Sequence, residues 1–129
     1  ICHEGVYSQK DKDAVFDHTL NGRDMILDAG GEMSGFAAEI ALTHHENYDG
    51  TGYPYGIKDC EIPFYSRVVS VADCFDAMCS DRFYRKAFTP ENAFDLILAE
   101  RGRKYDPEIL DNLRLCFDKL TEIYLNGSL

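Results

Sequence analysis

Apolar residues recur every three or four positions along most of this chain, and this spacing constrains its fold more than any other feature. The clearest case is the closing stretch, with Ile109, Leu113, Phe117, Leu120 and Tyr124. Such a period places side chains on one face of an α-helix that packs against a core. A Val-rich stretch over residues 62–79 keeps this spacing over a length that favours a helix rather than a strand.

Local signals place the ends of the predicted helices. Thr89 and Asp106 each precede a proline and a glutamate, an order typical of helix starts. Gly30 is predicted to end a first helix, Ser34 to cap a second, and Pro63 to lie in the first turn of a third. We therefore expect an all-α fold, a helical bundle of about five helices with no sheet.

Length and composition restrict the class of protein. The 129 residues suit one domain, and 45 % hydrophobic with 28 % charged residues indicates a soluble globular chain. A net charge of −10 argues against binding duplex nucleic acid, and no apolar run is long enough for membrane contact. Five cysteines without a CxxC spacing favour a reducing, cytoplasmic setting.

The stretch HHENYDGTGYP, residues 44–54, places two histidines at the end of the second predicted helix. Adjacent helical side chains point about 100° apart, but at a helix end they can converge on one centre or on two neighbouring ones. A lone inward histidine is more often a core residue hydrogen-bonded to a carbonyl group than a metal ligand. A pair followed by Glu46 and Asp49 instead offers imidazole and carboxylate ligands that suit Fe, Mn or Zn.

The loop after the histidines combines flexibility with rigidity. Gly50 and Gly52 permit positive φ angles and the close approach of a ligand or another backbone segment. Pro54 stiffens the end of the loop, and Tyr53 offers a flat ring and a hydroxyl group. Taken alone, the loop could also be an ordinary turn.

Asp73 lies among apolar residues of the third predicted helix, in the segment SVADCFDAM. A buried carboxylate without a partner is costly and tends to take up a proton. Asp73 therefore needs either a metal ion or a cationic partner, for which Arg67 is the candidate. The residues alone leave both alternatives open.

Cations gather directly after this helix, in SDRFYRKAF. Arg82 and Arg85 carry planar guanidinium groups that match phosphate oxygens. The alternative is that they pair with Asp76 and Asp81 on the surface. Their position after the presumed metal-binding helix adds weight to phosphate binding.

Together these segments resemble the HD-GYP domain, a bacterial branch of the HD metal-dependent phosphohydrolases. The matching string is HHENYDGTGYPYGIKDCEIPFYSRVVSVADCFDAMCSDRFYRKAF, continued by AERGRKYDPEIL. It meets the family pattern HHExxDGxGYPxG, IPxxxRIxxVADxxDAxxxxRxYR and a following DP at almost every fixed position. RFYR stands where relatives more often carry RPYR. Upstream, His18 in VFDHTLNGRDMIL resembles the histidine of the preceding family helix.

The resemblance implies an HD-domain phosphohydrolase fold and hydrolysis of cyclic di-GMP to pGpG or GMP in a signalling protein. It implies two or three divalent metal ions in the complete domain, iron or manganese, and GGDEF-type proteins as possible partners. The implied metal-binding and catalytic residues are His18, His44, His45 and Asp73, and the implied substrate contacts are Tyr53, Asp76, Arg82 and Arg85.

One departure concerns the HD dyad that names the family. His3-Glu4-Gly5 resembles the family turn that follows this dyad, so we expect residues 1–129 to be one HD-GYP domain truncated at its N-terminus. Three alternatives stay open: a catalytically incomplete or degenerate module that binds nucleotide or a GGDEF-type partner, an HD hydrolase acting on other nucleotides, and a fragment without independent function. The intact GYP loop speaks against the second.

Overall fold

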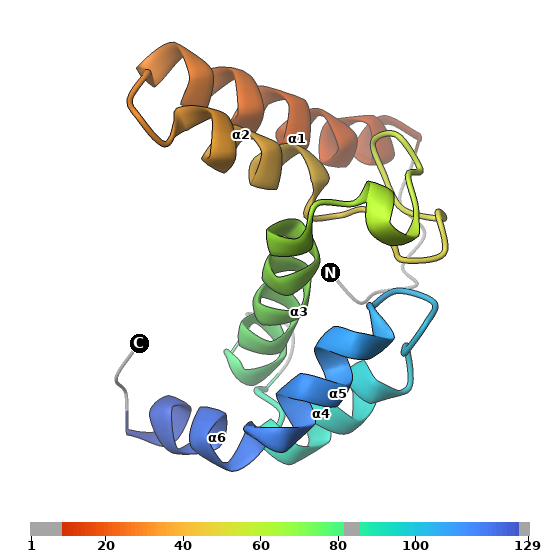
Figure 1. Ribbon diagram of the computed structural model, residues 1–129, viewed down its shortest axis with the longest axis vertical. Coiled ribbons are helices and arrows are strands. Elements are labelled where there is room, and N and C mark those ends of the chain that lie inside the picture. The colour runs from red at the N-terminus through yellow and green to blue at the C-terminus, as the bar shows by residue number, and fades with distance from the viewer. Residues whose placement is uncertain (1–8, 82–85, 127–129) are drawn as a thin grey trace.

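Helices make up the structure, a computed structural model that describes residues 9–81 and 86–126, without the side chains of residues 9–15. No β-strand forms in these ranges, and none of their helices is both long and apolar enough to cross a bilayer. The expected all-α fold is thus confirmed (Figure 1). The elements in chain order are α1 (Gln9–Ala29), α2 (Ser34–Thr43), the 3-10 turn η1 (Asp59–Glu61), α3 (Phe64–Cys79), α4 (Pro90–Leu98), α5 (Pro107–Leu115) and α6 (Phe117–Leu125).

Helices α1 and α2 form a hairpin that projects to one side of α3 (Figure 1). Gly30 and Gly31 end α1 as predicted, with φ angles of 67° and 120° that favour glycine. The predicted cap at Ser34 is wrong, because Ser34 is already the first residue of α2. Its hydroxyl donates to the Gly31 carbonyl at 2.8 Å instead of accepting from the helix.

Helix α3 connects the hairpin to the lower helices, and its buried face forms the centre of the core with α4 and α5. A buried hydrogen bond at 2.8 Å from Thr43 Oγ1 to Ser66 Oγ joins the end of α2 to the start of α3. The core consists of Val71, Cys74, Phe75, Met78, Cys79, Ala93, Phe94, Ile97, Tyr105, Ile109 and Leu110.

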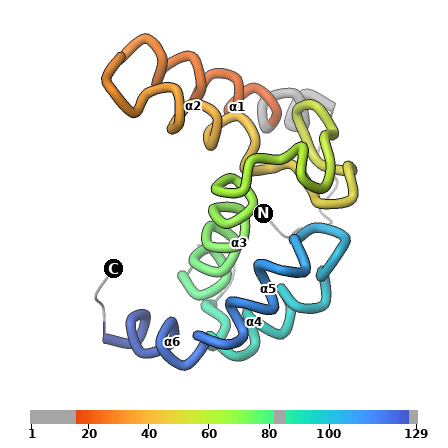
Figure 2. Tube along the Cα trace, viewed as in Figure 1, coloured from red at the N-terminus to blue at the C-terminus, as the bar shows by residue number. Residues whose placement is uncertain are grey.

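The two cap-and-proline starts are confirmed. The Thr89 side chain accepts from the Asn92 amide at 3.3 Å, and the Asp106 carboxylate accepts from the Glu108 amide at 2.8 Å. The prediction of one closing helix is wrong, however, since the chain leaves helical geometry at Cys116 and forms α5 and α6 separately. Figure 2 shows the trace turning there. The described residues thus form six α-helices, where about five are expected.

Arg67 on α3 forms an ion pair with Asp106 at the start of α5, and the two side chains are only 14 % and 4 % exposed. Arg67 is therefore committed to Asp106, which overturns the alternative that it neutralises Asp73. Asp106 serves two purposes at once, because the same carboxylate caps α5. Asp106 therefore links the orientation of α3 to that of α5.

Replacing Asp106 with alanine should lower the free energy of unfolding by about 3 kcal/mol, because it removes a helix cap and leaves a mostly buried guanidinium unpaired. Asp111→Ala is the matched control, since Asp111 pairs with Arg101 where both side chains are exposed. Chemical denaturation should show a clearly lower free energy of unfolding for Asp106→Ala and an almost unchanged one for Asp111→Ala. Equal losses would contradict the role given to Asp106.

Candidate metal centre

Three histidine side chains from two helices converge at one end of the α1–α2 hairpin. His18 lies on α1, while His44 and His45 directly follow α2. Their ring centroids are 5.7 Å (His18–His44), 5.0 Å (His18–His45) and 4.0 Å (His44–His45) apart. One ligand atom of each lies within 4.8 Å of those of the other two. Helix packing thus brings together residues that are distant in sequence.

The His44 ring is oriented by the end of its own helix. Its Nδ1 lies 2.9 Å from the Ala41 carbonyl oxygen and 3.1 Å from that of Ile40. Carbonyl oxygens only accept hydrogen bonds, so Nδ1 must carry the proton and donate. In the neutral ring this leaves the lone pair on Nε2, the arrangement usual for metal-binding histidines whose orientation a backbone carbonyl fixes.

His45 is held in the form that binds metals. Burial first, and then the neighbouring His44 and His18, lower its pKa to about 3. The ring is therefore neutral at physiological pH and keeps a lone pair for a metal ion. Three converging imidazoles, one of them oriented and one held neutral, form a donor set that fits a divalent transition metal.

A cavity of about 350 Å³ lies beside the histidines. The residues that line it come from the segment after α2, from α3 and from the loop before α5: His45, Asn47, Thr51, Gly52, Tyr53, Ser70, Asp73, Cys74 and Lys104. Asp73 is exposed to this cavity, so the expectation that it is buried is wrong. It also lies outside the group of three histidines.

The loop after His45 folds back on its own beginning. Gly50 has a φ of 83°, whereas Gly52 is required by close approach: a Cβ there would lie 2.1 Å from Asn47 N and 2.5 Å from Glu46 Cα. The Tyr53 amide then donates to the His45 carbonyl at 3.2 Å. Both expected roles of glycine are therefore present: a positive φ at Gly50 and the close approach of another backbone segment at Gly52. As a result the Tyr53 ring lies 5.0 Å from that of His45.

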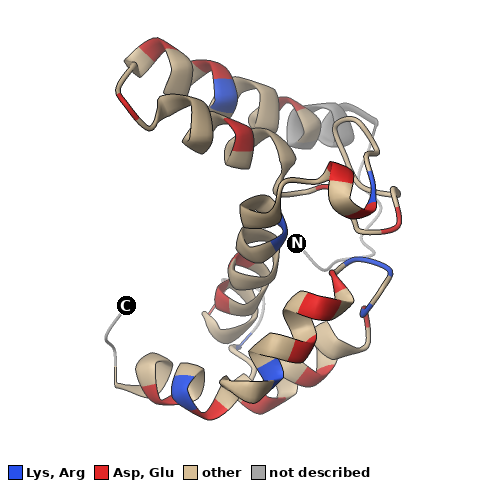
Figure 3. Cartoon of the chain, viewed as in Figure 1, with Lys and Arg blue, Asp and Glu red and all other residues tan. Residues whose placement is uncertain are grey.

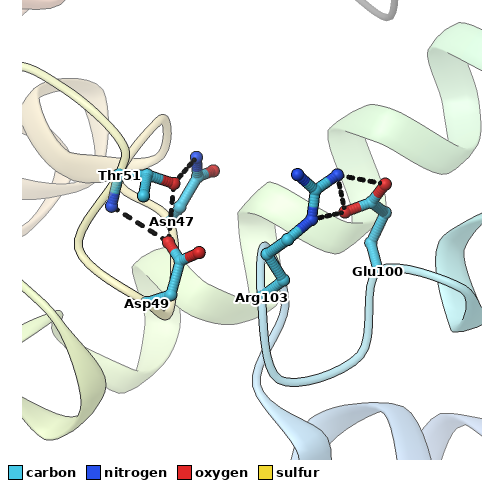
Figure 4. A network of polar contacts seen from close by, with 5 residues as sticks. All are labelled: Asn47, Asp49, Thr51, Glu100 and Arg103. Carbon is cyan, nitrogen blue, oxygen red and sulfur yellow. Dashed lines mark hydrogen bonds and ion pairs between the residues drawn. The ribbon is translucent and has the colours of Figure 1, made fainter.

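Two carboxylates near the histidines shape this loop. Glu46 is 3 % exposed, and its Oε1 accepts from the Tyr55 amide at 2.7 Å. Burial raises the pKa of Glu46, and hydrogen bonds from backbone N–H groups of the loop partly offset this rise. Asp49 Oδ1 accepts from the amide and the hydroxyl of Thr51 at 2.9 and 2.6 Å (Figure 4). Neither carboxylate belongs to the converging group, despite its place in the HHENYD motif.

Tyr53 forms part of the cavity wall and packs edge-on against Phe16, with ring centroids 4.5 Å apart. Burial and then the charge of Asp73 raise the pKa of Tyr53 to about 12. The phenol therefore keeps its proton at neutral pH and can act as a hydrogen-bond donor. Asp76 is exposed one turn further along α3 and is not among the lining residues. Arg82 and Arg85 lie outside the described residues.

Sequence reasoning missed Lys104, together with Asn47, Thr51, Ser70 and Cys74, as part of the cavity wall. Two backbone hydrogen bonds bring Lys104 there: the amides of Tyr48 and Asp49 donate to the carbonyls of Lys104 and Arg103 at 3.1 and 2.9 Å. No local pattern predicts a contact across this distance in sequence. The one available signal is that Lys104 directly precedes the Tyr-Asp-Pro start of α5.

Gly52→Ala should destabilise the fold by about 1–3 kcal/mol, because its methyl group would meet backbone atoms that cannot rotate away. Gly35→Ala is the control, since a Cβ at this position of α2 meets no atom within 4 Å. Thermal unfolding followed by circular dichroism should show a lower Tm for the first variant only. An unchanged Tm for Gly52→Ala would contradict the close packing of the loop.

The sequence was compared with protein families and with characterised proteins. The profile of the HD domain family matches residues 2–109. A cyclic di-GMP phosphodiesterase of Thermotoga maritima is 37 % identical over 96 % of this chain, and the response regulator RpfG of Xanthomonas campestris pv. campestris, also named a cyclic di-GMP phosphodiesterase, is 38 % identical over 88 %. The chain spans only 34 % and 30 % of their lengths.

A solved structure supports the fold. The cyclic GMP-AMP specific phosphodiesterase V-cGAP3 of Vibrio cholerae superposes with a TM-score of 0.67 over 90 % of this chain and 25 % of that protein. The sequence identity is 20 %, so this likeness speaks for the architecture alone.

Proposed function

The chain belongs to the HD domain family, within its HD-GYP branch, and we propose that it is part of a metal-dependent phosphodiesterase that hydrolyses cyclic di-GMP to pGpG or GMP. The observation that carries this proposal is the convergence of His18, His44 and His45 beside a cavity lined by the GYP loop. The names of the two similar relatives support the substrate. A bacterial signalling protein acting in the cytoplasm is the setting we propose.

The three histidines are the proposed metal ligands, and Asp73 is proposed to add a carboxylate from α3. Their mixed nitrogen and oxygen donors suit iron or manganese, with two or three ions in the complete domain. When bound, such ions activate water and neutralise charge on a phosphate group. Asp73 is well placed for this role because it is exposed to the cavity that His45 also lines.

Other residues are proposed to bind the nucleotide. Tyr53 keeps its phenolic proton and presents it at the cavity wall, where it can donate to a phosphate or ribose oxygen. Asp76 remains a prediction for a guanine contact, and Arg82 and Arg85 remain predictions for phosphate contacts. The substrate is held against the histidines because the loop that carries Tyr53 is bonded to the backbone of His45.

Metal content tests the ligand assignment. Asp73→Ala should lower the amount of iron or manganese bound per protein, because it removes a carboxylate ligand beside the histidines. Asp76→Ala is the matched control, a second exposed carboxylate on the same helix that should leave metal content unchanged. Elemental analysis of purified protein measures both. Full metal content in the Asp73 variant would rule out Asp73 as a ligand.

Activity tests the proposed reaction. The intact protein, loaded with Mn²⁺ or Fe²⁺ under anaerobic conditions, should convert cyclic di-GMP to pGpG or GMP, as measured by chromatography. His44→Ala should lower the rate at least about a hundredfold, since loss of a metal ligand removes the charge stabilisation that the ion supplies. Gly35→Ala, at the opposite end of α2 from His44 and with no atom within 4 Å of the added Cβ, should leave the rate unchanged.

Binding of cyclic di-GMP without any product would contradict the enzymatic proposal. It would instead favour the alternative of a catalytically incomplete module that senses nucleotide or contacts a GGDEF-type partner. Turnover of another cyclic dinucleotide with no turnover of cyclic di-GMP would contradict only the proposed substrate.

A further inference from the structure

Among the described residues that line the cavity, Lys104 is the one cation, and the proposed function gives it no part. We propose that Lys104 binds a phosphate group of the nucleotide and so determines affinity for it. The identity of the ligand, a phosphodiester of two nucleosides, rests on the proposed function. The anion-binding role itself rests on the geometry around Lys104.

The fold fixes the backbone of Lys104 against the loop of the metal site. The turn from Glu100 to Tyr105 is closed by the Gly102 amide, which donates to the Tyr105 carbonyl at 2.8 Å, and Gly102 has a φ of 76°. The amides of Tyr48 and Asp49 then bond to this turn. Lys104 is thereby held beside the segment that runs from His45 to Tyr53.

The neighbouring cations are engaged elsewhere. Arg103 makes a two-pronged ion pair with Glu100, at 2.7 and 2.6 Å, and its side chain is 71 % exposed (Figure 4). Arg101 makes the same kind of pair with Asp111 on α5. No carboxylate within the described ranges forms an ion pair with Lys104. Lys104 thus keeps its charge available for an anionic ligand.

The Lys104 side chain is also partly ordered in advance. Its Nζ lies 5.1 Å from the centroid of the Tyr105 ring, which is only 2 % exposed. This contact holds the ammonium over a fixed aromatic face without using its three N–H donors. Lys104 therefore loses less conformational entropy when it binds a ligand, because its side chain is already partly ordered by Tyr105.

Charge explains why such a residue is needed. The chain carries a net charge of −10, and acidic residues occur on each of α4, α5 and α6 (Figure 3). The cavity itself is lined by the carboxylate of Asp73. In the metal-free protein, a phosphodiester entering the cavity is repelled by this carboxylate unless a cation offsets it. A compact ammonium suits this task because it can donate to one phosphate oxygen from several directions.

Three variants of the intact protein test the role of Lys104. Calorimetric titration of metal-free protein with cyclic di-GMP measures binding without turnover. Lys104→Met should raise Kd about tenfold or more, the scale expected for one charge-assisted hydrogen bond. Lys104→Arg should stay within about threefold of the wild-type value, because it restores the charge. Arg103→Met, the adjacent cation paired with Glu100, should bind like the wild type.

Kinetics with Mn²⁺-loaded protein give a second readout that a merely structural role would not produce. Lys104→Met should raise KM by a factor similar to the rise in Kd and leave kcat within about twofold, since the contact is made in ground and transition states alike. A fall in kcat at unchanged KM would overturn the proposal. So would equal weakening in Lys104→Met and Arg103→Met, which would indicate a general charge effect.

The outcomes separate this inference from the proposed function. Wild-type turnover together with unchanged binding by Lys104→Met would overturn the role of Lys104 and leave the phosphodiesterase assignment standing. Binding weakened in Lys104→Met, with no turnover by any form, would support Lys104 and reject the reaction. A wild-type protein that binds neither cyclic di-GMP nor inorganic phosphate would overturn the proposal.

Discussion

The contact between Gly52 and the backbone of Glu46 and Asn47 is the constraint on which the site depends. A Cβ at Gly52 would lie 2.1 Å from Asn47 N and 2.5 Å from Glu46 Cα, so any side chain there would force the backbone to shift where it folds back after the histidine pair. This fold-back allows the Tyr53 amide to reach the His45 carbonyl and the Glu46 carboxylate to bond the loop from inside. His45, a proposed metal ligand, and the cavity wall at Tyr53 are therefore joined over a few residues of chain, and neither can shift without the other.

The second requirement is the management of charge. Three imidazoles this close would repel one another if all were protonated, and burial together with this mutual effect keeps His45 neutral. A neutral His45 costs the folded chain little when no ion is bound and keeps a lone pair for an ion when one is. Asp73 stays exposed at the cavity, where water can solvate it, so its charge needs no partner inside the protein.

Sequence reasoning succeeded where the controlling interactions are local. The helix starts at Thr89 and Asp106 and the roles of Gly50 and Gly52 depend on neighbours a few residues away. It failed where a distant contact decides. The apolar neighbours of Asp73 predict burial, but of these Val71 and Phe75 belong to the core while Asp73 is exposed and lines the cavity.

The same distinction explains the closing helix and the ion pair of Arg67. Periodicity predicts one continuous helix from Ile109 to Tyr124, because the spacing of apolar residues is the same on both sides of Cys116. Separate helices let Phe117 stack on Phe94 at 4.4 Å, a contact that depends on the position of α4. Arg67 likewise pairs with a residue 39 positions away, whose proximity only the packing of α3 and α5 provides.

The histidines and Lys104 are held at the site in different ways, and this decides which of them can be substituted without disturbing the others. His18 and His44 are anchored on helices, so their geometry follows from helix packing and from the carbonyl groups at the end of α2. Lys104 reaches the cavity from a turn that is attached by backbone hydrogen bonds, which are independent of side-chain identity. Its side chain can therefore be replaced without moving the histidines, so the proposed anion contact and the proposed metal ligands can be changed independently.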